Sequence, residues 1–174
     1  MKKMKKAAAF VIALSMVVLL LCGCDTFAKK KAFSDYGNSL QSDVPYWNDL
    51  SEASDQIGSG NDMTMMKAVI QSRIIPDLTA ISKQAASRNA TITDTEIKTI
   101  DTEYVNAVTH MNEAYTLILD AINNNGDSAK MNKAMTELNV AMSSLQNYGN
   151  GLKAYCGKYG IDSSSIDSML KLFN

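Results

Sequence analysis

Few side chains in this chain could act as a nucleophile or as its base. His110 is the single histidine, and Cys156 is the only thiol beyond the first 24 residues. Nucleophilic catalysis needs a base within hydrogen-bond reach of the nucleophile, and no motif surrounds either residue. His110 lies beside the apolar helical stripe through Val108 and Met111, which is typical of a boundary residue. Cys156 follows Tyr155, where a small core residue is expected. We therefore predict a protein that is not an enzyme.

Patterns for metal ligands are also sparse. A di-iron helical protein needs Glu-x-x-His pairs, but Ala107 stands three residues before His110. A copper site could use thioethers, and Met63, Met65 and Met66 lie close together in the sequence. Methionine at helical spacing usually fills gaps in a core, however. We expect no metal and no cofactor.

The first 24 residues have the composition of a targeting segment. Four lysines (Lys2, Lys3, Lys5 and Lys6) precede an apolar run over residues 7–21. The run is shorter than the roughly 20 residues of a membrane span, and small residues follow it, as in a secretory signal. Its ending, Leu21-Cys22-Gly23-Cys24, resembles the lipobox of bacterial lipoproteins. The resemblance implies lipidation of Cys24, cleavage before it, and a location at the extracytoplasmic face of the cytoplasmic membrane. An uncleaved N-terminal anchor would leave the domain on the same side.

Charge separates a basic tether from an acidic domain. The whole chain has 17 basic and 18 acidic residues, a balance that argues against nucleic-acid binding. Lys29, Lys30 and Lys31 follow Cys24 closely and are expected to face anionic lipid headgroups. From residue 32 onward acidic residues outnumber basic ones. The expected divisions are a signal peptide (1–23), a lipidated cysteine with its tether (24–31), and a helical domain (32–174).

Apolar residues in this domain recur every three or four positions, as on helices that bury one face. Four segments carry the pattern (33–57, 63–85, 97–122 and 131–159), and residues 163–174 carry a shorter one. The four long segments alternate in charge between acidic and basic, and the short loops between them favour antiparallel neighbours. We predict an all-α fold, an antiparallel up-down-up-down four-helix bundle with a short C-terminal helix.

Capping residues and prolines refine the expected helices. The cap signals are Asp62, a capping box of Thr93 and Glu96, Asp127 or Ser128, and Gly160 as a left-handed C-cap. Pro45 and Pro76 lie within apolar patterns that continue past them, so we expect them to kink their helices rather than end them.

In this arrangement the loops 58–62 and 123–128 lie far from the membrane. Four acidic residues gather there and form the expected partner-facing tip: Asp55, Asp62, Asp120 and Asp127. The leading hypothesis is a non-enzymatic bundle, held to membrane lipid through Cys24, that binds a protein or peptide partner at the cell envelope. The alternative is a sensor or carrier of a small ligand or metal. A polar pocket between helices, for instance near Trp47 and Tyr104, would favour that alternative.

Overall fold

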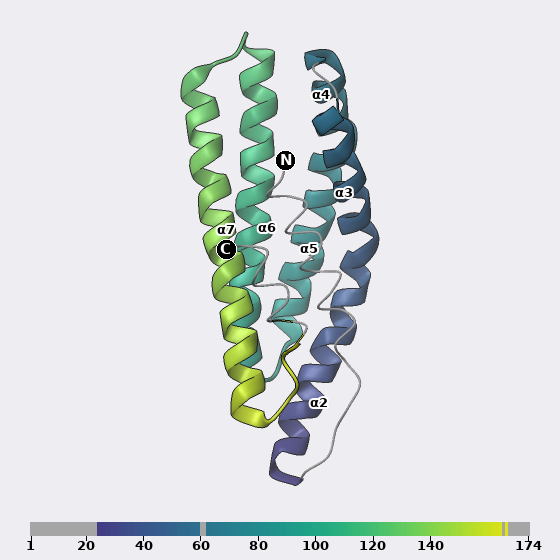
Figure 1. Ribbon diagram of the computed structural model, residues 1–174, viewed down its shortest axis with the longest axis vertical. Coiled ribbons are helices and arrows are strands. Elements are labelled where there is room, and N and C mark those ends of the chain that lie inside the picture. Colours follow the sequence, from purple (N-terminus) through teal and green to yellow (C-terminus); the bar gives the residue numbers. More distant parts are fainter. Residues whose placement is uncertain (1–23, 60–61, 165, 167–174) are drawn as a thin grey trace.

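The computed structural model describes residues 24–59, 62–164 and 166, without the side chains of residues 24–26 and 59. Every regular element in this part is a helix, which confirms the predicted all-α class. The elements are Cys24–Ser39 (α2), Leu40–Asp43 (η1), Val44–Ser59 (α3), Met63–Val69 (α4), Ile70–Ile74 (η2), Ile75–Thr91 (α5), Thr95–Asn123 (α6) and Ser128–Tyr159 (α7). Figure 1 shows these helices lying alongside one another, with α6 next to α7. The predicted signal peptide and most of the predicted C-terminal helix lie outside the described residues.

Neither proline ends its helix, because the winding of the helix changes just before each one. Proline lacks an amide hydrogen and clashes with the carbonyl four residues earlier. Before Pro45 the chain forms the 3-10 turn η1, so that the amide of Val44 takes the Gln41 carbonyl that Pro45 cannot use. Before Pro76 it forms the wider π-turn η2, where the amide of Ile75 reaches Ile70. The helices therefore continue through both prolines, as the apolar spacing predicts.

The core follows the predicted stripes over most of their length. Its largest fully buried side chains come from all four stretches and include Trp47, Leu50, Ile74, Leu78, Tyr104, Leu145 and Tyr148. The pattern overestimates burial at the start of two stretches, since Met63 is 59% exposed and Met135 is 46% exposed. Met63 is the first residue of α4, next to a loop, whereas Met135 follows the fully buried Ala134 on the outward side of α7.

Three helix ends match the predicted caps and one does not. The carboxylates of Asp62 and Asp127 accept hydrogen bonds from amides in the first turns of α4 and α7, and Gly160 ends α7 at a φ of +60°. The N-cap of α6 is Asp94, whose Oδ1 accepts from the amides of Glu96 and Ile97. The capping box of Thr93 and Glu96 is therefore wrong. Aspartate is as good a cap as threonine and stands one residue later, which leaves Glu96 free for other partners.

Helix α7 packs mainly on α6, and Gly151 lies at a close approach between them. A Cβ atom added to Gly151 would lie 2.9 Å from Cγ1 of Ile100, whereas one added to Gly157 would meet nothing within 4 Å. The stiff, β-branched Ile100 cannot easily withdraw. Glycine therefore allows the two helices their observed separation at this level.

Gly151→Ala should destabilise the protein, whereas Gly157→Ala should stabilise it. Overpacking costs about 1–3 kcal/mol, and helix propensity favours alanine over glycine by about 1 kcal/mol where there is room. Urea unfolding of both variants measures the difference. A Gly151→Ala variant as stable as Gly157→Ala would contradict the close approach of α6 and α7.

Candidate functional site: a buried charged centre beside a cleft

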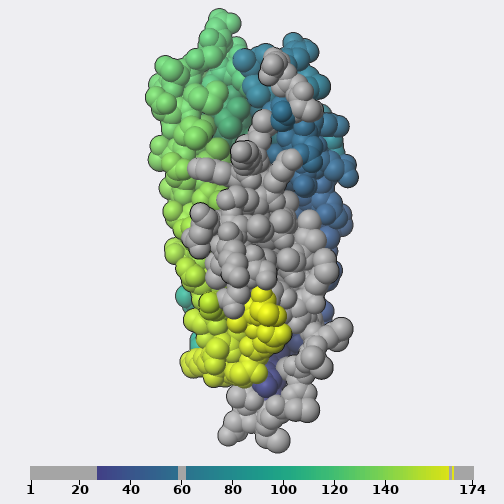
Figure 2. All heavy atoms as spheres, viewed as in Figure 1, coloured from purple at the N-terminus to yellow at the C-terminus, as the bar shows by residue number. Residues whose placement is uncertain are grey.

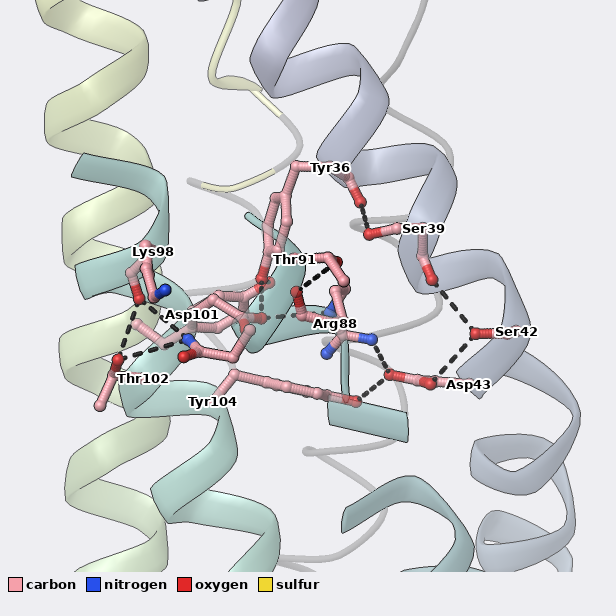
Figure 3. Close-up of polar contacts among 12 residues, drawn as sticks. Tyr36, Ser39, Ser42, Asp43, Arg88, Thr91, Lys98, Asp101, Thr102 and Tyr104 are labelled. Atoms are coloured by element: carbon pink, nitrogen blue, oxygen red, sulfur yellow. Dashed lines mark hydrogen bonds and ion pairs between the residues drawn. The ribbon is translucent and has the colours of Figure 1, made fainter. Parts of the chain in front are cut away.

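A buried arginine joins three elements of the fold. Arg88 on α5 donates from Nη1 to Oδ2 of Asp43 at 2.9 Å and from Nε to Oδ1 of Asp101 at 3.2 Å. Figure 3 shows its guanidinium between Asp43 on η1 and Asp101 on α6. Both aspartates are fully buried, and only 6% of the Arg88 side chain is exposed. These ion pairs are therefore screened from solvent, unlike the surface pairs elsewhere on the protein.

Aromatic side chains complete the hydrogen bonding around the two carboxylates. Tyr104 donates to Oδ2 of Asp43 at 2.9 Å and accepts from the indole nitrogen of Trp47 at 2.9 Å. Tyr36 donates to Oδ1 of Asp101 at 2.8 Å, and the hydroxyls of Tyr36 and Tyr148 lie 2.7 Å apart. Since the single proton of Tyr36 goes to Asp101, Tyr148 is the donor in that second pair. We refer to Arg88, the two aspartates, Trp47 and the three tyrosines as the Arg88 centre.

The Arg88 centre holds more acidic than basic groups. Burial raises the pKa of the Asp43 carboxyl, while Arg88 and the Tyr104 hydroxyl oppose that rise. Burial alone would lower the pKa of Arg88, but the nearby Tyr36 and Asp43 hold it above the ordinary value, and Asp101 adds to their effect. Arg88 therefore stays charged, and its guanidinium carbon lies 5.0 Å from the centre of the Tyr104 ring, within the range of a cation–π contact.

Two atoms of the Arg88 centre are left without a hydrogen bond. Nη2 of Arg88 and Oδ2 of Asp101 are buried and have no partner in the described part of the chain. The Tyr104 ring compensates the guanidinium in part. Unsatisfied buried polar atoms cost free energy, so the Arg88 centre is held together against this cost.

A cleft of about 400 Å³ lies against the Arg88 centre, where α2, α5 and the start of α6 meet. It is lined by Ala28, Lys31, Ala32, Asp35, Tyr36, Ser39, Arg88, Thr91, Ile92, Thr93, Asp94 and Ile97. Tyr36 and Arg88 belong both to the wall of the cleft and to the buried network. The volume and the mixed polar and apolar lining suit a small polar molecule. Trp47 and Tyr104, the residues near which a polar pocket would favour a carrier, are fully buried and do not line this cleft.

Comparison of the chain with protein-family models, with curated proteins and with solved structures found no match. Among the described helices, none is both long enough and apolar enough to cross a membrane.

The expected tether is part of the first helix. Residues 24–31 form the first half of α2, where Lys30 is only 8% exposed. Nζ of Lys29 lies 2.8 Å from Asp94 and 3.3 Å from Glu96, so this residue fastens α2 to the start of α6. Lys31 is exposed and pairs with Asp35 one turn later. Of the three lysines, Lys31 is the most available to a lipid surface, and the side chain of Cys24 lies outside the described residues.

The four acidic residues of the expected tip lie near one end of the molecule, and three of them hold local structure. Asp62 and Asp127 cap helices. Asp120 pairs with Lys130 and accepts a hydrogen bond from Asn124. Asp55 is exposed on α3. Capping accounts for the aspartates at positions 62 and 127 without a partner molecule.

Charged residues at core positions of the helical pattern indicate the Arg88 centre, which the apolar residues alone do not reveal. Asp43 occupies the core spacing between Leu40 and Trp47 on the first stretch. Arg88 continues the spacing of the second stretch, three residues after Ala85, and Asp101 lies between buried residues of the third. Charged residues at core positions on three separate helices must be buried together or not at all, because an unpaired buried charge is prohibitively costly.

Cys156 fits the structural role that the sequence predicts. Its side chain is buried, and burial raises the pKa of its thiol to about 12. The reactive form of cysteine is the thiolate, which a pKa this high makes scarce at neutral pH.

Two further aspartates, Asp49 on α3 and Asp77 on α5, lie near each other outside the Arg88 centre. Nε of Arg73 donates to Oδ2 of Asp49 at 3.1 Å. Arg73 holds the pKa of Asp49 below its ordinary value, whereas burial, together with the nearby Asp49, raises the pKa of Asp77 to about 7. The folded protein therefore binds a proton at Asp77 that the unfolded chain releases near pH 4.

Asp77→Asn should gain stability relative to the native protein as pH rises. In the native protein the contribution of Asp77 is most favourable below pH 4 and is lost as pH rises through about 7. Asparagine cannot ionise, so the advantage of the variant in free energy of unfolding should be larger at pH 8 than at pH 5. Urea unfolding at both pH values measures this, with the exposed Asp35→Asn as control. An equal difference at the two pH values would contradict a protonated Asp77.

Proposed function

We propose that this protein is a lipid-anchored, non-enzymatic helical bundle that binds a protein or peptide partner at the extracytoplasmic face of the cytoplasmic membrane. The lipobox resemblance ending at Cys24 supports the anchor. The proposed fold is an antiparallel up-down-up-down bundle. Ion pairs support this direction of the helices, since Lys29 joins the start of α2 to the start of α6 and Lys130 joins the start of α7 to the end of α6.

The observation that carries partner binding is a set of exposed methionines at the end of the molecule away from α2. Met63 and Met65 on α4 are 59% and 36% exposed, and Met135 near the start of α7 is 46% exposed. Figures 1 and 2 show α4 and the start of α7 at the same end of the molecule. Flexible, polarisable thioethers suit surfaces that adapt to a partner. Asp55 adds a negative charge on α3.

Anchoring is tested by Cys24→Ala in the full-length chain. We expect the native protein to incorporate labelled fatty acid and to resist carbonate extraction from membranes. The variant should lose the label, because it lacks the Cys24 thiol that would form the thioether to the lipid. Retention of the label by the variant would contradict lipidation at Cys24.

Partner binding is tested with a photo-crosslinking residue at position 65 in the membrane-anchored protein. The matched control places the same residue at position 153, which is exposed near the other end of α7. A discrete adduct formed only from position 65 would support the methionine end as the contact. Equal labelling from both positions would contradict it.

A second candidate function rests on the cleft beside Tyr36 and Arg88. A carrier or sensor would hold a small polar ligand there, next to a guanidinium whose charge is fixed by buried carboxylates. Native mass spectrometry of protein purified gently from its host tests this candidate. A stoichiometric added mass that disappears in Tyr36→Phe and Ser39→Ala variants would favour the carrier over the partner-binding bundle.

A further inference from the structure

One group of metal-ligand side chains lies outside the Arg88 centre, on the seam between α6 and α7. His110 and Glu113 are one turn apart on α6, and Glu137 faces them from α7. One ligand atom from each residue lies within 4.8 Å of the other two. In the described part of the chain this is the one place where three histidine, cysteine or carboxylate groups gather so closely.

The geometry of this group is held by the seam itself. Nδ1 of His110 lies 2.7 Å from Oε2 of Glu137. The Glu137 side chain is only 14% exposed and that of His110 is 34% exposed, whereas Glu113 is more open at 45%. Helices α6 and α7 are packed along most of their length, so the two halves of the group have fixed relative positions. A third ligand from the exposed Glu113 can close over an ion with a change of rotamer alone.

An imidazole and two carboxylates suit a divalent transition ion, above all zinc. Zinc binds histidine nitrogen and carboxylate oxygen at about 2.0–2.2 Å and accepts three protein ligands with water in the remaining position. Calcium and magnesium prefer oxygen ligands alone. The hydrogen bond between His110 and Glu137 would give way to the ion, since a metal ligand must be deprotonated.

We propose that His110, Glu113 and Glu137 form a binding site for a divalent transition ion of the zinc type on the α6–α7 seam. The site is independent of the lipid anchor and of the methionine end. The sequence predicts no metal, so this proposal departs from that prediction. Two helices supply the ligands jointly, and the spacing within α6 does not indicate that Glu137 on α7 lies beside His110.

Lys133 provides an internal test of this site. It lies on α7 one turn before Glu137, and its Nζ is 3.3 Å from Oε1 of Glu113. Its positive charge therefore competes with a metal ion for the most exposed ligand. Lys133→Gln removes this competitor without touching a ligand, so it should increase zinc affinity. A purely structural role for the three ligand residues predicts no such gain.

The experiment is calorimetric titration of Zn²⁺ into the full-length-expressed protein, purified from membranes in detergent with a tag that contains no histidine. We expect one ion per chain. His110→Gln and Glu137→Gln should each weaken binding by at least about tenfold, the smallest loss usual even for outer-shell substitutions at metal sites. Glu103→Gln, which removes a carboxylate near Asn147 on the same seam, should bind as the native protein does. Co²⁺ in place of Zn²⁺ should give visible absorption bands that the His110→Gln variant lacks.

Two results would overturn the site. One is the absence of 1:1 binding in both the native protein and Lys133→Gln. The other is zinc affinity that is unchanged by His110→Gln and Glu137→Gln in variants whose circular dichroism spectra match that of the native protein. Because none of these measurements reads out lipid attachment or contact with a partner, their failure leaves the proposed function standing.

Discussion

Replacing Arg88 with methionine should lower the free energy of unfolding by about 3–5 kcal/mol, the usual cost of removing one partner from a buried ion pair. Methionine keeps much of the volume but leaves Asp43 and Asp101 buried without a counter-charge. The loss should be smaller at acid pH, because burial already raises the pKa of Asp43 and favours its protonation. Urea unfolding followed by circular dichroism at pH 5 and pH 8 measures both effects.

The matched control is Arg73→Met. Arg73 pairs with Asp49 at the surface, where its side chain is 24% exposed and that of Asp49 is 38% exposed. Exposed pairs contribute about 1 kcal/mol or less, so this variant should lose far less stability. The triple variant Asp43→Leu, Arg88→Met and Asp101→Leu should recover most of the loss, since apolar side chains can replace a whole buried ionic group. Equal losses for Arg88→Met and Arg73→Met would contradict the buried role of Arg88.

Trp47→Ala should destabilise the protein by a similar amount, about 3–5 kcal/mol, through the cavity that it leaves. The indole is fully buried and donates to the Tyr104 hydroxyl. Trp47→Phe should cost less, because most of the apolar contact survives while the donor is lost. Tyr46→Ala, at the half-buried neighbouring position, serves as control. Urea unfolding of the three variants gives the order of losses, and a loss from Tyr46→Ala equal to that from Trp47→Ala would contradict it.

Apolar periodicity predicts the helices well because burial selects for it directly. Leu50, Leu78, Val108 and Leu145 all lie on predicted stripes and are fully buried. The prolines are harder to interpret from the sequence, since proline is compatible both with a kinked helix and with the end of a helix. The outcome at Pro45 and Pro76 depends on 3-10 and π-turns that no residue pattern marks.

The Arg88 centre could be predicted only in part. The positions of Asp43, Arg88 and Asp101 on core stripes are visible in the sequence. Their contact depends on how far η1, α5 and α6 are shifted along their axes relative to one another. Periodicity within each helix does not fix these shifts. Lys29 is a similar case, because its partners Asp94 and Glu96 are more than 60 residues away. A run of three lysines near a lipobox favours a tether on composition alone.

The helical state of residues 24–31 has a consequence for encounters at the membrane. As an extended chain, the segment from Asp25 to Lys31 would reach about 25 Å, but as helix it rises only about 10 Å. With a lipid on Cys24 and no flexible spacer, the protein would diffuse in two dimensions within a thin layer above the bilayer. Its effective concentration toward membrane-bound molecules of matching height would be high, and toward taller or freely diffusing ones low. The short rise of this helical segment would thus favour encounters with membrane-bound molecules of similar height over encounters with taller or freely diffusing ones.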